Sequence, residues 1–68
     1  MNKPKAYEVT AARSAAGLTQ QKAAALIGQD DRAWRRYESG EMTMHPASWE
    51  LFLLKTGQHP TMQLTSRS

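Results

Sequence analysis

Three arginines and two aromatic residues alternate within the short stretch "DRAWRRYESG". A guanidinium group can donate two parallel hydrogen bonds to O6 and N7 of guanine, the commonest specific contact between a protein and a base pair. If the stretch is a helix, with about 100° between successive residues, Arg32, Arg35 and Arg36 share one face. Trp34 and Tyr37 then lie on the opposite face. The pattern predicts a helix that is buried along its aromatic side and presents its basic side chains outward. The plainer alternative is a solvated charged face without a ligand.

The preceding element favours nucleic acid as the partner of this basic face. Residues 20–28, "QQKAAALIG", predict an alanine-rich helix that begins after the N-cap Thr19 and ends at Gly28. Asp30 is a suitable N-cap for the arginine-bearing helix, expected over residues 31–39, so only a short turn separates the two helices. A short glycine-containing turn between two steeply crossing helices is typical of the helix-turn-helix unit.

A helix is also expected on each side of this unit. Residues 5–17 have Tyr7, Ala11 and Ala15 at helical spacing, and Gly17 marks their end. After the unit, Pro46 opens a helix that extends through residue 55. Its N-cap is either Thr43 or His45, and Gly57 follows it.

The sequence therefore predicts an all-α fold, a compact domain of four to five helices that includes the helix-turn-helix. No segment shows the period-two alternation of a strand, and 68 residues leave room for only one core. We expect the helix-turn-helix domain over residues 1–58 and a short polar tail over residues 59–68.

Composition narrows the choice of partner and compartment. Nine Lys and Arg residues against six Asp and Glu residues give a net charge of +3, which suits an anionic partner. There is no cysteine, no apolar run of the roughly 20 residues that span a bilayer, and no apolar core of a secretory signal near the start. We expect a soluble cytoplasmic protein without membrane contact.

Catalytic and metal-binding patterns are missing from the sequence. His45 and His59, the only two histidines, are too far apart in the chain to form a compact ligand pair. Ser14 and Ser48 fall in expected helices, without a recognisable activating context. We therefore expect no enzyme activity, no metal, no cofactor and no small-molecule ligand.

The stretch from Arg13 to Gly40 resembles the helix-turn-helix of phage Cro and C1-type (XRE-like) repressors. The matching features are "GLTQ" shortly after Arg13, the small Ala24, the helix break at Gly28, and "YESG" at the end of the third helix. The similarity continues through Pro46 and the last helix. In size, the chain is similar to small phage regulators that repress their own operons, including those associated with anti-CRISPR genes.

This resemblance implies a role for each matching residue. It places four residues of the third helix at base edges in the major groove: Arg32, Arg36, Arg35 and Asp31. It places four polar residues at the DNA backbone: Gln20, Gln21, Lys22 and Ser39. It makes four further residues structural: Arg13 and Glu38 as a pair between the first and third helices, with Trp34 and Tyr37 as buried aromatics.

Two residues depart from the pattern of these repressors. A carboxylate at Asp31 would repel phosphate, accept a hydrogen bond from cytosine N4, or brace Arg32 or Arg35, and we favour the brace. Gln29 stands where a small apolar residue is usual in the turn, so looser packing is expected there.

The most apolar stretch is "WELFLL" in the last helix. Trp49, Phe52 and Leu53 form one helical stripe that we expect in the core. Leu51 and Leu54 lie on a neighbouring face. They pack under the C-terminal tail or form a subunit interface, and the sequence does not favour one over the other.

A homodimer is expected on DNA, because one helix-turn-helix reads too few base pairs to select a site in a genome. Symmetric pairing of two copies implies an operator with an inverted repeat. Leu51 and Leu54 are the expected dimer contacts. Met42 and Met44 flank a loop, and the sequence does not decide whether this loop touches the DNA backbone or a second subunit, or what role the two residues have.

These inferences lead to one functional expectation and two alternatives. We expect a sequence-specific, double-stranded-DNA-binding transcriptional regulator, a phage or mobile-element repressor. One alternative is the antitoxin of a toxin–antitoxin pair. The other is a protein-interaction module that uses the basic face of the third helix.

Overall fold

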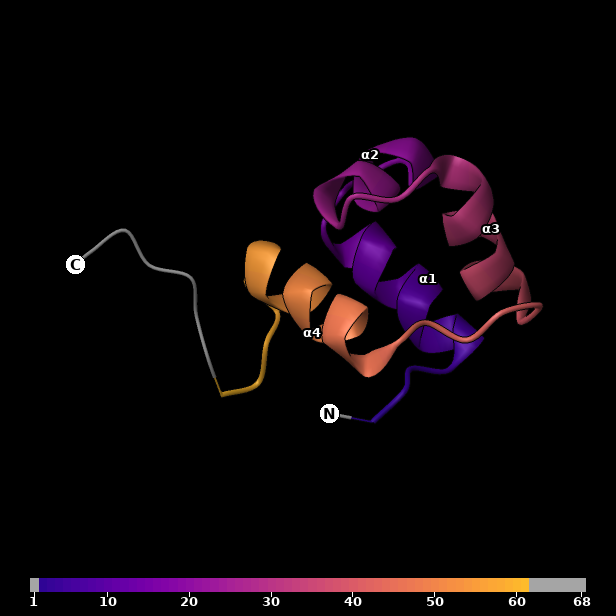
Figure 1. The fold of residues 1–68 in the computed structure, drawn as a ribbon. Helices are drawn as coiled ribbons and strands as arrows, with labels where there is room; N and C mark the ends of the chain where they lie inside the picture. Colours follow the sequence, from indigo (N-terminus) through magenta and orange to yellow (C-terminus); the bar gives the residue numbers. More distant parts are fainter. Residues whose placement is uncertain (1, 62–68) are drawn as a thin grey trace.

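The computed structural model describes residues 2–61, and within them the chain forms four helices and no strand (Figure 1). The all-α prediction is therefore confirmed, with four helices. Residues 62–68 of the expected tail lie outside the described residues. The helices are α1 (Ala6–Ala15), α2 (Gln20–Leu26), α3 (Asp31–Ser39) and α4 (Pro46–Lys55).

Side-chain caps fix where the last three helices begin. The hydroxyl of Thr19 accepts the N–H of the third residue of α2 at 3.1 Å, and Asp30 accepts the corresponding N–H of α3 at 2.9 Å. For α4 the cap is His45 rather than Thr43, since its ring Nδ1 accepts an N–H of the first turn at 3.0 Å. A side-chain cap typically stabilises a helix by about 1 kcal/mol. Gly40 ends α3 in the left-handed conformation, with φ of 84°, which costs glycine little.

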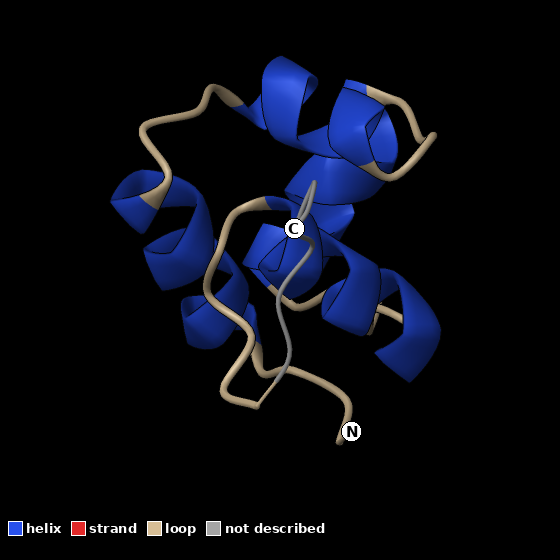
Figure 2. Cartoon of the chain, turned by 90° about the vertical axis from the view of Figure 1, so that its left-hand side faces the viewer, coloured by secondary structure: helices blue, strands red, loops and turns tan. Residues whose placement is uncertain are grey.

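The α2–α3 pair is the most closely packed pair of helices, and α1 and α4 pack on it. Figure 2 shows the helices in blue, joined by tan loops. The turn over residues 27–30 joins α2 to α3, and Gly28 within it has φ of 70°. Helix α3 also packs on α1, while α4 packs on α2. This arrangement fixes one side of α3 and leaves its other side outside the bundle.

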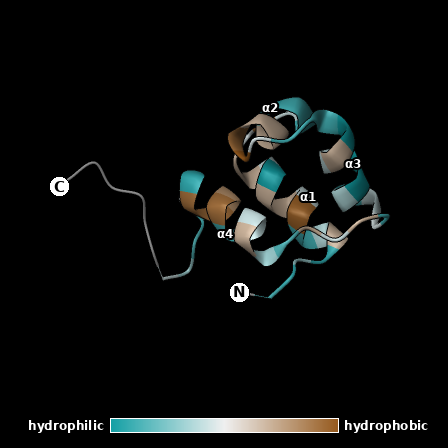
Figure 3. Cartoon of the chain, viewed as in Figure 1, coloured by the Kyte–Doolittle hydropathy of each residue, from teal (hydrophilic) through white to brown (hydrophobic). Residues whose placement is uncertain are grey.

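Trp34 of α3 lies in the hydrophobic core and is fully buried. Its ring centroid is 4.8 Å from that of Phe52 in α4 and 6.3 Å from that of Tyr37. Figure 3 shows the contrast along the chain, with polar residues over much of α3 and hydrophobic residues in α4. The remaining buried hydrophobic residues are Val9, Ala12, Ala23, Ala24, Ile27, Met44 and Leu53.

The apolar spacing that indicated α1 does not mark the side of that helix that faces the core. Tyr7 is 68% exposed, and Ala11 and Ala15 are exposed as well. Val9 and Ala12 face the core instead. The exposed stripe lines one side of an open groove of about 390 Å³ between α1 and α4.

Met44, whose role the sequence left open, is fully buried and belongs to the core. It directly precedes His45, the N-cap of α4. A hydrophobic residue at this position commonly packs over the first turn of the following helix, and the half-buried Trp49 of that region packs on the same core. Met44 therefore cannot contact DNA or a second subunit, whereas Met42 is 41% exposed.

Candidate nucleic-acid interface

The outer face of α3, formed by Arg32, Arg35 and Arg36, is exposed. On the opposite side of the helix, Trp34 is fully buried and Tyr37 is only 8% exposed. The five side chains thus divide between the two sides as the helical wheel requires. Because both aromatic rings are fixed in the core, α3 cannot rotate about its axis without losing their burial. The three guanidinium groups therefore project from a helix of fixed orientation.

The three arginines of the outer face differ in their partners. Arg35 Nη2 lies 3.3 Å from Asp31 Oδ2, one turn earlier in the helix, so the carboxylate braces Arg35 and not Arg32. Arg36 Nε lies 3.8 Å from Glu41 Oε2, just beyond the end of α3. Among residues 2–61, Arg32 makes no hydrogen bond or ion pair. Exposed ion pairs contribute only about 0–1 kcal/mol, so these pairs add little to the stability of the fold.

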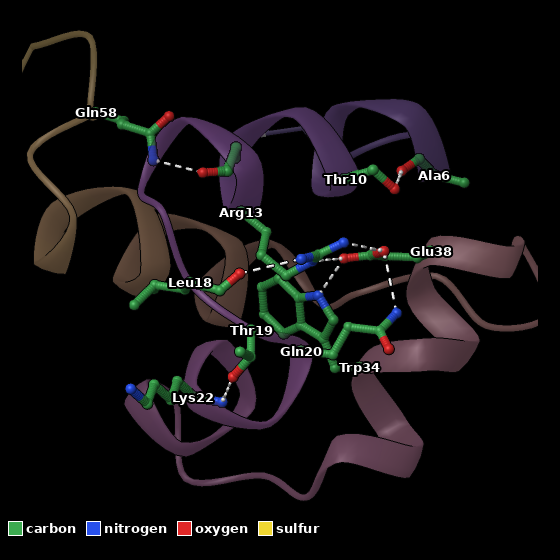
Figure 4. A network of polar contacts seen from close by, with 11 residues as sticks. Ala6, Thr10, Arg13, Leu18, Thr19, Gln20, Lys22, Trp34, Glu38 and Gln58 are labelled. Atoms are coloured by element: carbon green, nitrogen blue, oxygen red, sulfur yellow. Dashed lines mark hydrogen bonds and ion pairs between the residues drawn. The ribbon is translucent and has the colours of Figure 1, made fainter.

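The carboxylate of Glu38 connects α3 to α1 (Figure 4). It accepts hydrogen bonds from Arg13 Nε at 2.5 Å and from Nη2 at 3.2 Å. It also accepts the indole N–H of Trp34 at 2.5 Å and the side-chain amide of Gln20 at 3.2 Å. Arg13 in turn donates to the backbone carbonyl of Leu18 at 3.0 Å. The expected Arg13–Glu38 pair is thus part of a larger network around the buried indole.

The electrostatics of Glu38 follow from this network. Burial alone would raise the pKa of Glu38, but the hydrogen bonds from Arg13, Trp34 and Gln20 and the positive charge of Arg13 outweigh it. The pKa of Glu38 is therefore lowered from its ordinary value. The hydrogen bond to Glu38 raises the pKa of Arg13 against the opposing effect of burial. Both groups are charged at neutral pH, and both act within the fold rather than at its surface.

Two of the four residues expected at the DNA backbone are already engaged within the protein. The amide of Gln20 donates to Glu38, so this side chain positions α2 against α3. The hydroxyl of Ser39 donates to the carbonyl of Arg36 at 3.1 Å and accepts the N–H of Glu41 at 3.2 Å. Its single proton is therefore not free for a phosphate oxygen.

The other two expected backbone contacts, Gln21 and Lys22, are exposed. Among the described residues, the Lys22 side chain makes no ion pair. Both residues lie in the first turn of α2, whose N-terminal end carries the positive end of the helix dipole. This end of α2 retains the chemistry that a phosphate contact needs, through Lys22 rather than through Gln20.

Gln29 in the turn contradicts the expectation of loose packing. Its side-chain oxygen accepts the hydroxyl of Tyr37 at 2.5 Å, and its amide nitrogen lies 3.5 Å from the hydroxyl of Ser48. Gln29 therefore connects α3 to α4, and sequence reasoning missed it. The sequence did indicate that a buried tyrosine needs a hydrogen-bond partner for its hydroxyl group. It does not identify which residue is that partner.

The expected dimer contacts lie on α4 and differ in exposure. Leu51 is 37% exposed, while Leu54 is half-buried. Between them, Phe52 is fully buried and Leu53 is 7% exposed. Leu51 is thus the residue of this stretch with apolar area to offer a second subunit.

The folded part of the chain extends to His59, one residue past the expected domain end. The His59 side chain is only 4% exposed, and its Nε2 lies 3.1 Å from Oε2 of Glu50 in α4. Its Nδ1 accepts the N–H of Thr61 at 3.2 Å, which puts the ring proton on Nε2, where it donates to Glu50. The beginning of the expected tail therefore packs on α4.

Within residues 2–61, no group of three or more His, Asp or Glu side chains is arranged to hold a metal ion. Over the same residues, no helix has the length and apolar character to cross a membrane. No protein-family model matches the sequence, and no curated protein is similar enough to count as a relative.

Proposed function

We propose that this chain is a sequence-specific, double-stranded-DNA-binding transcriptional regulator of the Cro/C1 repressor type, encoded by a phage or mobile element. In this proposal α3 enters the major groove of DNA, which is wide enough to admit a helix. The observation that carries it is the division of α3 into a buried aromatic side and an exposed side with three arginines.

The chemistry of the outer face supports DNA as the anionic partner. Arginine binds phosphate and also reads guanine through two parallel hydrogen bonds. Base reading requires a helix of fixed orientation, because a hydrogen bond weakens steeply when donor and acceptor are misaligned. The buried Trp34 and the Glu38 network supply that fixed orientation. An acidic protein surface would need the positive charge but not the rigid support.

A homodimer on an inverted repeat belongs to the same proposal. Twofold pairing doubles the number of base pairs read, and it is the commonest form of protein assembly. Leu51 is the exposed apolar residue of α4 that supports a subunit interface there. Met44 is buried, so its side chain offers no surface to a subunit interface.

The experiment that tests the proposal measures the affinity of the chain for duplex DNA of random sequence as salt is raised. Counterion release predicts a linear fall of log affinity with log salt, with a slope set by the number of phosphates contacted. Arg32→Ala should reduce the affinity, whereas Lys3→Ala, which removes the same charge from an exposed residue before α1, should change it little. Failure to bind duplex DNA at low salt would favour the protein-interaction alternative.

A further inference from the structure

The three arginines of the outer face are not equivalent, because only Arg35 has a carboxylate partner within the same helix. Asp31 Oδ2 lies 3.3 Å from Arg35 Nη2, and Arg36 is 3.8 Å from Glu41. Arg32 has no ion-pair partner among residues 2–61. We propose that Asp31 is a specificity-determining residue: it holds Arg35 for reading a guanine and prevents Arg35 from binding phosphate. This inference rests on the DNA-binding function proposed above.

The geometry of the pair leaves Arg35 able to read a base. A guanidinium group carries five N–H donors, and the ion pair with Asp31 runs through Nη2, which holds two of them. The second N–H of Nη2 is parallel to an N–H of a neighbouring nitrogen, and this pair of donors matches O6 and N7 of one guanine. The carboxylate restricts the rotation of a long side chain that is otherwise 66% exposed. A restricted side chain loses less conformational entropy when it binds, so the pair favours one orientation in the groove.

The charge of Asp31 also acts against phosphate. Phosphate contacts carry no direct sequence information, so an arginine that binds phosphate raises the affinity for all sequences alike. Asp31 neutralises Arg35 at short range and repels a phosphate that approaches the same place. It repels the O6 and N7 acceptors of guanine more weakly, because they carry partial charges rather than a full negative charge, and it attracts the amino group of cytosine. Asp31 thus lowers the affinity for wrong sequences more than it lowers the affinity for the right one.

The test compares Asp31→Asn with the wild-type chain on two DNA substrates, a duplex selected from a random pool and duplex DNA of random sequence. Asn keeps the size of the side chain and removes its charge. The ratio of the two affinities should fall by about fivefold or more, the lower end of the discrimination given by one bidentate base contact. The fall should come mainly from tighter binding to the random duplex. Thermal unfolding of the variant verifies that the fold is intact.

Glu41→Gln is the matched control, because it removes one negative charge on the other side of the same basic face. This variant should strengthen binding to both duplexes alike and keep their affinity ratio. If Asp31→Asn behaves like Glu41→Gln, Asp31 contributes only its charge and the inference is wrong.

A double variant separates the brace from direct reading by Asp31. In an Arg35→Ala chain, Asp31→Asn should leave the affinity ratio unchanged, because the brace then has nothing to hold. If the ratio still falls, Asp31 reads cytosine N4 itself and the brace is wrong. Failure of the proposed function is distinguishable, because it would be seen in the wild-type chain. That function is wrong if the wild-type chain binds no duplex DNA or has no preference for a selected sequence.

Discussion

The indole nitrogen of Trp34 donates a hydrogen bond to Glu38, one turn further along α3, at 2.5 Å. The same carboxylate accepts two hydrogen bonds from Arg13 of α1. One acidic group therefore joins the buried ring of α3 to the neighbouring helix. Since Trp34 sits opposite the arginines, this bond helps to set the direction in which the outer face of α3 points.

Trp34→Phe should lower the free energy of unfolding by about 1.5–3 kcal/mol, the usual contribution of a hydrogen bond to a charged group. Trp34→Ala should be more severe, at about 3–5 kcal/mol, enough to unfold a domain of this size. Urea denaturation followed by circular dichroism gives both values. Trp49→Phe is the control, because Trp49 is half-buried and its indole nitrogen makes no hydrogen bond within residues 2–61. Equal effects of the two Phe variants, or a well-folded Trp34→Ala chain, would contradict the role of Trp34.

The lowered pKa of Glu38 predicts a loss of stability in acid. A carboxyl group whose pKa is lower in the folded than in the unfolded chain stabilises the fold above the unfolded pKa, and it loses this contribution as pH falls through the folded pKa. The contribution is present at neutral pH and should fall away below the ordinary value of 4.5. Glu38→Gln should be less stable at pH 7, and the difference from wild type should shrink as pH drops from 5 to 3. Glu41→Gln is the control for loss of a carboxylate at the surface, and it should change the stability at pH 7 little because this side chain is exposed. A constant difference between Glu38→Gln and wild type across this pH range would show that the charge of Glu38 is not involved.

Arg32→Ala should weaken binding to the selected site by about 1–3 kcal/mol and relax the base preference at one position. Arg32 is exposed and makes no hydrogen bond or ion pair within residues 2–61, so the variant should keep its fold and lose only what Arg32 contributes to binding. Lys22→Ala should weaken binding to all sequences alike, as expected for a phosphate contact. Fluorescence anisotropy on selected and random duplexes distinguishes the two patterns. If both variants lose affinity equally on both substrates, Arg32 does not read a base.

Leu51→Glu should reduce cooperative binding to the full inverted repeat while leaving the affinity for a single half-site unchanged. Leu51 is 37% exposed, so a charge there costs the isolated fold little, whereas it opposes apolar contact with a second subunit. Titration of full-site and half-site duplexes measures both affinities. Unchanged cooperativity would place the dimer interface elsewhere.

The local features of the fold could be predicted from the sequence because they depend on neighbouring residues. Thr19 and Asp30 cap their helices through bonds that reach only three residues along the chain. The burial of Trp34 and Tyr37 opposite the arginines follows from helical periodicity alone. These features suffice to define α3 and its two sides.

Features that depend on contacts between helices could not be predicted in this way. The alanine side chains of α1 are small enough to lie either in the core or at the surface. Helical spacing therefore indicated the exposed face that carries Tyr7 instead of the face on which Val9 is buried. Gln20 and Gln29 find their partners in α3, at positions that only the packing of the helices brings together. Met44 lies outside any helix, where periodicity gives no information about burial.

Selection of duplexes from a random pool by the wild-type chain tests most directly whether α3 reads a DNA sequence. We expect enrichment of one inverted repeat, with half-sites centred about 10 base pairs apart, one turn of DNA. A parallel selection with Arg32→Ala should lose a preference at symmetric positions in both half-sites. Recovery of sequences without any common element, while the chain remains folded, would contradict the reading of DNA by α3.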